Sequence, residues 1–255
     1  MKTTTIFFSG TNTTKTIITK IAYEISSEVV PINLTNRSLE TDVEFTSEQL
    51  VLVGMPVYGG RIPSIARDSL KHLKGTQTPV ILVAVYGNRE FEDALVEMQD
   101  LMGNNGFKVI AAGAFIAQHS IFPQTAKGRP DAADFDCIKD FSRQCKTLIQ
   151  KGISIHATPI HIPGNRPYKI PGNIPLKIMT SKQCTSCGIC AKLCPVNAIP
   201  TDKPYNTNHE QCIHCGRCMN ACPEHARHYG GLLFHLAGTL FMWKNSKRKE
   251  PQFFF

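Results

Sequence analysis

The first 155 residues of the chain alternate between two hydrophobic patterns. Mostly apolar runs, which are typical of buried strands, occupy residues 3–8, 29–34, 49–58, 78–87 and 107–117. Between these runs, apolar side chains recur at the spacing of a helix face, which indicates helices over 13–27, 62–73, 89–106 and 131–149. Buried strands that alternate with helices predict a parallel sheet with helices on both faces.

The remainder of the chain lacks this alternation. Residues 156–178 hold five prolines and two Pro-Gly-Asn turns, which predicts a linker between a first domain, 1–155, and a second, 179–230. The apolar tract 231–243 is shorter than the ~20 residues that a membrane span needs, so we expect a packed helix and no membrane span. For the aromatic end of the tail, 231–255, two alternatives stay open: a disordered segment, or phenylalanines docked on the protein body.

Cysteine use is the strongest signal in the composition. The chain has ten cysteines, and eight of them fall between positions 184 and 222. No signal peptide is recognised at the N-terminus, so we expect a cytoplasmic protein in which cysteines serve metal or redox chemistry. The sequence CTSCGICAKLCP (184–195) recurs as CIHCGRCMNACP (212–223), and both read C-x2-C-x2-C-x3-C-P. The alternative is a pair of zinc sites, which do not require this x2-x2-x3 spacing of cysteines.

The paired motifs resemble those of the bacterial two-cluster ferredoxins over roughly residues 180–230. That resemblance implies two [4Fe–4S] clusters and one-electron transfer. In such motifs the fourth cysteine binds the cluster of the other motif. One cluster is then expected on Cys184, Cys187, Cys190 and Cys222, and the other on Cys212, Cys215, Cys218 and Cys194.

The positive charge of the chain lies entirely in its C-terminal part. Residues 1–160 hold 16 basic and 16 acidic residues, whereas residues 161–255 hold 12 and 4, a formal excess of +8. A basic excess is typical of nucleic-acid binding. Two clusters with their thiolates carry about −4 in total and offset much of it. We therefore expect redox proteins as partners, and no nucleic acid.

Three loops that follow predicted strands suggest a ligand at one edge of the sheet, because open parallel sheets bind ligands at the carboxyl ends of their strands. The first, SGTNTTKT (9–16), is nearly a Walker A loop but lacks the glycine before Lys15, and the loops at 54–63 and 85–91 offer no aspartate for Mg²⁺. A hydroxyl-rich loop at a helix N-terminus suits a single phosphate. Glycines and tyrosines in the other two loops suit a flat ring. A phosphate site next to a site for a flat ring favours flavin mononucleotide (FMN).

These loops resemble those of flavodoxins. The phosphate loop of that family is similar to S/T-x-T-G-x-T, and residues 9–14 match it except that Asn12 stands where glycine is common. The whole chain resembles the flavodoxin–ferredoxin fusion proteins of anaerobes, whose other loops are similar to PVYGGRIP (56–63) and YGNREF (86–91). The implied FMN contacts are Ser9, Thr11, Asn12, Thr13, Thr14, Pro56, Val57, Tyr58, Gly59, Gly60, Tyr86, Gly87 and Asn88.

The resemblance implies an α/β flavodoxin-like, doubly wound parallel sheet of strand order 2-1-3-4-5, joined to a small α+β bacterial ferredoxin-like domain. It also implies electron transfer between the two [4Fe–4S] clusters and FMN. An alternative stays open: an enzyme, a ferredoxin-type flavin-dependent reductase of a small substrate such as a quinone or a flavin. Its candidate substrate contacts are Tyr58, Tyr86, Arg89 and His119.

Overall fold

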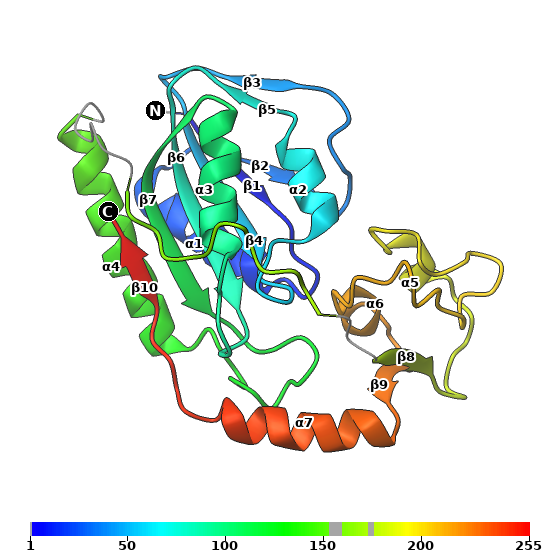
Figure 1. The fold of residues 1–255 in the computed structure, drawn as a ribbon. Coiled ribbons are helices and arrows are strands. Elements are labelled where there is room, and N and C mark those ends of the chain that lie inside the picture. The colour runs from blue at the N-terminus through cyan, green and yellow to red at the C-terminus, as the bar shows by residue number, and fades with distance from the viewer. Residues whose placement is uncertain (1, 153–159, 173–175) are drawn as a thin grey trace.

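A computed structural model describes residues 2–152, 160–172 and 176–255 (Figure 1). The first part of the chain contains β1 (Thr3–Phe7), α1 (Thr13–Ile25), β2 (Val29–Asn33), β3 (Val43–Phe45), β4 (Leu50–Pro56), α2 (Ser64–Leu70), β5 (Leu73–Gly75), β6 (Thr78–Tyr86), α3 (Ala94–Asn104), β7 (Phe107–Ile116) and α4 (Ala132–Gln150). The second part contains β8 (Lys177–Thr180), α5 (Ile189–Lys192), α6 (Arg217–Asn220), β9 (Arg227–Gly230), α7 (Leu232–Lys244) and β10 (Gln252–Phe254).

The main sheet has six strands in the order β10-β7-β6-β4-β1-β2. The pairs β1–β2, β1–β4, β4–β6 and β6–β7 are all parallel, and β10 alone pairs antiparallel, with β7. The five predicted strands thus lie in the predicted order 2-1-3-4-5, because β3 and β5 belong to a separate small sheet. The prediction of a flavodoxin-like doubly wound sheet is confirmed.

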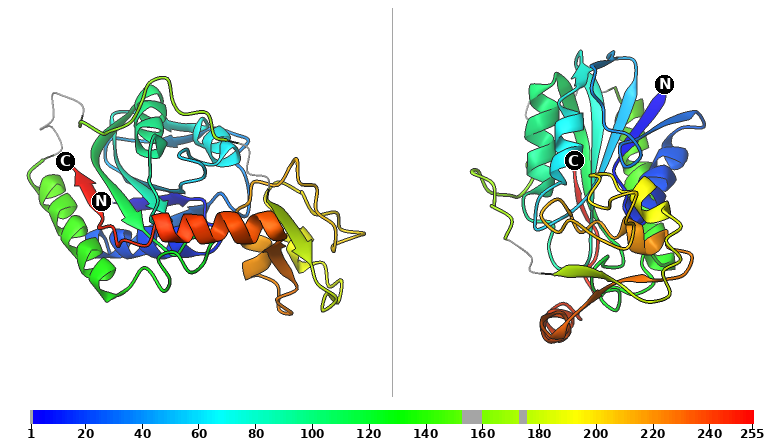
Figure 2. Two further views of the ribbon diagram at one scale, coloured as in Figure 1. Left: turned by 60° about the horizontal axis from the view of Figure 1, so that its bottom comes forward. Right: turned by 90° about the vertical axis from the view of Figure 1, so that its right-hand side faces the viewer.

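Alternating side chains of the central strands build a hydrophobic core on each face of the sheet. In β6, Leu82 and Ala84 face one core, which α2 and α3 cover, whereas Ile81 and Val83 face the other, which α1 and α4 cover (Figure 2). Every residue of β4 and β6 is buried, as expected for parallel strands covered on both sides. The sheet thereby forms a rigid base whose strand ends fix the positions of the loops that follow them.

Two local predictions differ from the structure. The segments β3 and β5 form an additional two-stranded parallel sheet, and three residues each are too few to give a periodic pattern. The helix predicted from residue 89 begins only at Ala94 in α3. Asn88 and Glu92 have φ angles of 64° and 44°, and such left-handed backbone holds the intervening residues in a loop.

The described residues of the predicted linker lie along the first domain. The carbonyl of Ile160 accepts a hydrogen bond from Gln99 Nε2 at 2.7 Å, and Arg166 forms an ion pair with Asp100 at 2.6 Å. Asp93, at the start of α3, accepts the N–H of Lys169 at 2.6 Å. Residues 156–159 and 173–175 of the predicted linker lie outside the described residues, and the domain boundaries stay a prediction.

The C-terminal tail is docked, which decides between the two alternatives. After α7, the chain runs back to the main sheet, where Phe253 packs against Phe115 and Phe141 with ring centroids 5.6 and 5.0 Å apart. In α7 itself, Phe241 packs against Phe122, in the loop after β7, at 4.8 Å. Helix α7 therefore spans from the cysteine-rich unit (residues 176–230) to the sheet (Figure 2). Among the described residues, no helix has the length and apolarity to cross a membrane.

Candidate functional site

Two small cavities in the cysteine-rich unit are each lined by four cysteines. The first is lined by Cys184, Cys187, Cys190 and Cys222, and the second by Cys194, Cys212, Cys215 and Cys218. Each cavity thus combines three cysteines of one motif with the fourth cysteine of the other. These are the two groups that the motif spacing predicts.

Matching backbone turns bring these cysteines together. Gly188 and Gly216 adopt left-handed φ angles of 75° and 74°, which glycine reaches without steric cost, and the one-turn helices α5 and α6 follow them. The fourth cysteine of each motif accepts a backbone N–H: Ala198 N lies 3.2 Å from Cys194 Sγ, and Ala226 N lies 3.3 Å from Cys222 Sγ. Such hydrogen bonds stabilise a thiolate, the form that binds metal.

The chemistry of the cavities suits a cationic cluster core. Burial raises the pKa of Cys215 to about 11 and that of Cys218 to about 12, so both thiols stay neutral unless positive metal charge is present. Within the described ranges, no group of three or more His, Cys, Asp or Glu side chains is arranged to hold a single metal ion. A [4Fe–4S] cluster is larger than one ion, and the two four-cysteine cavities are the candidate centres for it.

A buried arginine beside the first cavity was not predicted. Arg227 of β9 donates to the carbonyls of Pro204 and Asn206 at 2.9 and 3.0 Å, and its Nη1 lies 3.9 Å from Cys190 Sγ. Its positive charge lowers the pKa of the neighbouring Cys190, although burial raises that pKa more. The sequence gives no signal for this role, because an arginine outside the cysteine motifs is ordinarily a surface residue.

A crevice at the carboxyl ends of the parallel strands brings the three predicted loops together. It is lined by Gly10, Thr11, Thr13, Thr14, Pro56, Val57, Tyr58, Val85, Tyr86, Gly87, Ala117, Gln118, His119 and Ser120. The last four residues form a fourth loop, which follows β7. Of the predicted contacts, Ser9, Asn12, Gly59, Gly60 and Asn88 do not line this crevice and shape its loops instead.

The first loop presents backbone donors at the start of α1. Asn12 is left-handed, with φ 67°, and Thr13 is the first residue of the helix. Ser9 anchors the loop: its N–H donates to Thr35 Oγ1 at 2.6 Å, and its Oγ accepts from Lys15 N at 3.1 Å. Among the described residues, the N–H groups of 10–14 donate to no protein acceptor. Free N–H groups at a helix N-terminus suit a phosphate dianion.

The conformation of Asn12 gives a testable prediction. We expect Asn12→Ala to lower the free energy of unfolding by about 1 kcal/mol, because a left-handed backbone is costly for alanine. Asn12→Gly, the matched control, should keep the free energy of unfolding near that of the wild type, because glycine adopts this conformation readily. Urea unfolding measures the effect. Equal behaviour of both variants would contradict the prediction.

The second loop is a tight turn that only glycine fits. Tyr58 N donates to Arg61 O at 2.8 Å, and Gly59 and Gly60 between them have φ angles of 61° and 91°. A Cβ on Gly60 would lie 1.9 Å from Glu92 Oε2. The Tyr58 ring lies edge-on to Phe8, and burial raises the pKa of Tyr58 well above its usual value, so the phenol stays neutral.

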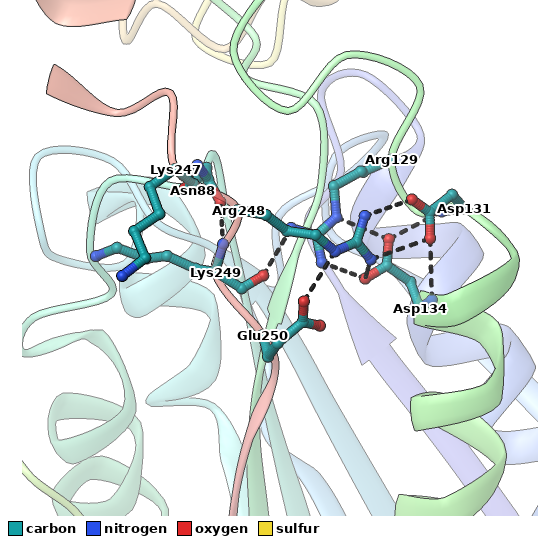
Figure 3. A network of polar contacts seen from close by, with 8 residues as sticks. All are labelled: Asn88, Arg129, Asp131, Asp134, Lys247, Arg248, Lys249 and Glu250. Atoms are coloured by element: carbon teal, nitrogen blue, oxygen red, sulfur yellow. Dashed lines mark hydrogen bonds and ion pairs between the residues drawn. The ribbon is translucent and has the colours of Figure 1, made fainter. Parts of the chain in front are cut away.

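The third loop is held by the C-terminal tail. Asn88 Nδ2 donates to the carbonyls of Asn245 and Lys247 at 2.8 and 2.9 Å, and Asn88 Oδ1 accepts the N–H of Lys249 at 3.1 Å (Figure 3). The structure therefore gives the Asn88 side chain another role than the flavin contact that the sequence predicts. The Tyr86 ring also faces the core, 5.8 Å from that of Phe91.

His119 is a half-buried, neutral side chain at the edge of the crevice. Its Nδ1 accepts the N–H groups of Ile121 and Phe122, each at 3.1 Å, and its ring packs against that of Phe241 at 4.8 Å. Burial, with a smaller contribution from the charge of Arg89, lowers the pKa of His119 to about 4. Protonation of Nδ1 would break both hydrogen bonds, which fixes the ring as an acceptor near neutral pH.

This lowered pKa predicts a pH dependence of stability. The unfolded state takes up a proton on His119 as the pH falls through 6.5, whereas the folded state resists until about pH 4. The stabilisation is thus complete above pH 6.5, and up to about 3 kcal/mol is lost as the pH falls to about 4. We expect His119→Asn, whose amide oxygen can accept similar bonds, to flatten this dependence in urea unfolding. A steep profile retained in His119→Asn would refute the assignment.

Comparison with known families decides what the cysteine-rich unit is. Residues 183–226 match the family of 4Fe-4S dicluster domains. The chain joins a flavodoxin-like domain to a 4Fe-4S dicluster domain. The first assignment follows from the strand order of the sheet, and the second from the matched segment. No curated protein matches the chain.

Several solved structures are similar to the flavodoxin-like domain. A flavodoxin from the domain Archaea is 15% identical over 59% of this chain and 99% of its own, with a TM-score of 0.41. The flavodoxin of Streptococcus pneumonia TIGR4 is 16% identical over 59% and 99%, with a TM-score of 0.42. The Fusobacterium nucleatum flavodoxin bound to flavin mononucleotide is 18% identical over 58% and 98%, with a TM-score of 0.40.

The dicluster domain lies directly against the crevice of the flavodoxin-like domain. Arg217 donates to Thr35 O at 2.6 Å and to Asn36 Oδ1 at 2.5 Å, and both acceptors follow β2. Ile213 and Cys215 belong to the hydrophobic core on the α2 and α3 side of the sheet. The second candidate cluster site and the candidate flavin site therefore adjoin within one chain.

Proposed function

We propose that this protein transfers electrons between two [4Fe–4S] clusters and one FMN. The observation that carries the proposal is the contact of Cys215, which lines a four-cysteine cavity, with the loop that offers free N–H donors for a phosphate. A cluster takes up or releases single electrons, and a flavin takes up one or two. Redox proteins that donate or accept single electrons are the partners that this chemistry requires.

The cysteines of each cavity are the ligands in this proposal. Cys184, Cys187, Cys190 and Cys222 hold one cluster, and Cys212, Cys215, Cys218 and Cys194 hold the other. Part of the lining of the second cavity is apolar, through Ile178, Val196 and Ile199, and limits the access of water there. Exclusion of water and hydrogen bonds to sulfur are the two means by which a protein sets the reduction potential of a cluster.

The proposed flavin contacts fall into two groups: residues that bind the phosphate and residues that line the ring. The hydroxyls of Thr11, Thr13 and Thr14 and the free N–H groups of residues 10–14 bind the phosphate, while Ser9 and Asn12 hold the loop in shape. Pro56, Val57 and Tyr58 border the ring on one side, and Tyr86 and Gly87 border it on another. The Gly59-Gly60 turn and the Asn88 side chain keep these two borders in place.

The reductase alternative receives less support from the side chains proposed for it. Arg89 is paired with Glu92, whose Oε2 lies 2.5 Å from Arg89 Nη2. His119 already accepts two backbone hydrogen bonds, and the Tyr86 ring packs in the core. Arg89 and His119 are thus held by the protein itself, whereas Tyr58 and Tyr86 line the crevice, where they serve the proposed flavin site. Electron transfer remains the function that the geometry supports best.

Cofactor analysis of the anaerobically purified protein tests the proposal. We expect about eight irons, about eight acid-labile sulfides and about one FMN per chain. Removal of the flavin, followed by titration with FMN and with riboflavin, should show much tighter binding of FMN, because only FMN carries the phosphate. Zinc in place of iron, absence of flavin, or equal affinity for the two flavins would each contradict the proposal.

A further inference from the structure

The two cysteine loops of the dicluster domain are alike in backbone but differ in what they touch. Gly188 and Gly216 occupy equivalent positions with nearly equal φ angles. A Cβ on Gly188 would have no atom of the described chain within 4 Å, whereas a Cβ on Gly216 would lie 3.1 Å from Thr11 Cγ2 and 3.6 Å from Ser120 Cβ. The second loop therefore lies on the crevice of the flavodoxin-like domain, and the first does not.

The residues beside these glycines show the same asymmetry. Ile189, in the first loop, is 39% exposed, and its neighbour Cys187 is also exposed. The equivalent residue of the second loop, Arg217, is held by two hydrogen bonds to the residues after β2. Cys215 is buried, and its carbonyl oxygen would lie only 2.2 Å from a Cβ on Gly10. The phosphate loop and the second cysteine loop are thus in direct backbone contact.

We propose that the two clusters act in a fixed order. The cluster of Cys194, Cys212, Cys215 and Cys218 exchanges electrons with the flavin, and the cluster of Cys184, Cys187, Cys190 and Cys222 exchanges them with an external redox protein. This inference rests on the function proposed above. Electron-transfer rates fall steeply with distance, so the cluster in contact with the crevice is the direct partner of the flavin. The exposed first loop is the side that a second protein can approach.

The electrons balance in single steps. An external one-electron donor reduces the outer cluster, that electron passes to the inner cluster, and the inner cluster is oxidised as the flavin is reduced. Two such passages, with protons taken from solvent, reduce the flavin fully. Flow in the opposite direction uses the same order, with an external one-electron acceptor at the outer cluster.

The first test compares equivalent side chains of the two loops. In the holoprotein, Arg217→Ala removes two hydrogen bonds from a charged donor, which should lower the equilibrium constant for contact between the second cysteine loop and the flavodoxin-like domain about tenfold. We expect electron exchange between flavin and clusters after flash photoreduction to slow by up to the same factor. Ile189→Ala, the matched control, should keep the wild-type rate within about twofold while it slows reduction by an external one-electron protein. Equal effects of the two variants on internal exchange would overturn the proposed order.

The second test uses the glycine pair and a readout that does not depend on activity. Gly216→Ala and Gly188→Ala carry the same left-handed strain, but only the former adds an atom at the junction. In nuclear magnetic resonance spectra of the loaded protein, the inner cluster should broaden the amide signals of Gly10 and Thr11. We expect Gly216→Ala to change the shifts and widths of these signals, because its Cβ must displace Thr11 by a few tenths of an ångström, and Gly188→Ala to leave them as in the wild type. Sharp signals in the wild type, or the same spectrum in both variants, would overturn the inference.

Failure of this inference and failure of the proposed function are distinguishable. If the wild type holds no flavin or only one cluster, the proposed function fails before any variant is compared. If all variants hold the full complement of iron, sulfide and flavin and yet exchange electrons alike, only the order of the clusters is wrong.

Discussion

Replacing Cys194 by alanine is expected to disrupt the cluster of the second motif and to leave the cluster of its own motif in place. Cys194 lines a cavity with Cys212, Cys215 and Cys218, not with its three neighbours in sequence. The iron content should therefore fall from about eight to between about seven and about four per chain, because a site with three cysteines either loses one iron and keeps a three-iron cluster or loses the whole cluster. Iron and sulfide analysis with electron paramagnetic resonance of the reduced protein measures the effect. Cys137→Ala, outside both motifs, should keep all of the iron.

Two double variants identify which cluster is lost. With crossed ligands, Cys184 and Cys194 belong to different clusters, so their combined replacement should leave neither [4Fe–4S] cluster intact. Cys184 and Cys222 line the same cavity, so their combined replacement should retain about four irons. Ligation within each motif would give the reverse pattern, and that result would refute the assignment.

Arg129→Met is expected to lower the free energy of unfolding by about 3 kcal/mol or more. Arg129 and Asp134 form a buried ion pair, with exposed fractions of 6% and 2%, in which Arg129 Nε lies 2.8 Å from Asp134 Oδ2. Removal of one partner leaves a buried charge unpaired, which costs about 3–5 kcal/mol. Arg129 also donates to Lys249 O at 2.8 Å, so the variant should loosen the tail as well (Figure 3). Chemical unfolding gives the free energy, and hydrogen exchange of residues 245–255 reports on the tail.

A surface pair on the same helix provides the control. Arg143 is paired with Asp140 in α4, but both side chains are exposed. Arg143→Met should therefore change the free energy of unfolding by less than about 1 kcal/mol. Arg248 Nη2 lies 3.5 Å from Asp134 Oδ1, so Arg248 still pairs with Asp134 in Arg129→Met. We therefore expect the fall in the free energy of unfolding of that variant near the lower end of the range of about 3–5 kcal/mol. Equal effects of the two variants would show that the buried pair contributes nothing beyond a surface contact.

Local patterns were sufficient for the sheet but not for its additions. The strands β4, β6 and β7 were predictable because each is a long, mostly apolar run, as expected for strands of a parallel sheet that is covered on both faces. The segments β3 and β5 were not, because three residues carry no period. The strand β10 was not either: its pairing with β7 joins residues more than 130 positions apart, and no short-range pattern reports such a contact.

The conformation of the phosphate loop could be predicted from the sequence, whereas the contacts of the third loop could not. Asn12 stands where glycine is common in flavodoxins, and its left-handed φ of 67° is a conformation that asparagine adopts more readily than most residues. Its conformation depends on neighbours within a few residues, which the sequence displays. The partners of Asn88 are Asn245, Lys247 and Lys249, and they reach it only because α7 carries the tail back to the sheet.

The sequence by itself therefore determined the doubly wound sheet, the three loops at its edge and the two repeated cysteine motifs. Each of these is encoded in residue spacings within one element or one loop. Only the tertiary structure decided that the second cysteine loop, and not the first, lies on the crevice, and that Arg227 is buried beside Cys190. The physical reason is that both motifs have the same local geometry. What distinguishes them is packing between residues such as Thr11 and Gly216, which lie far apart in the chain and meet only after folding.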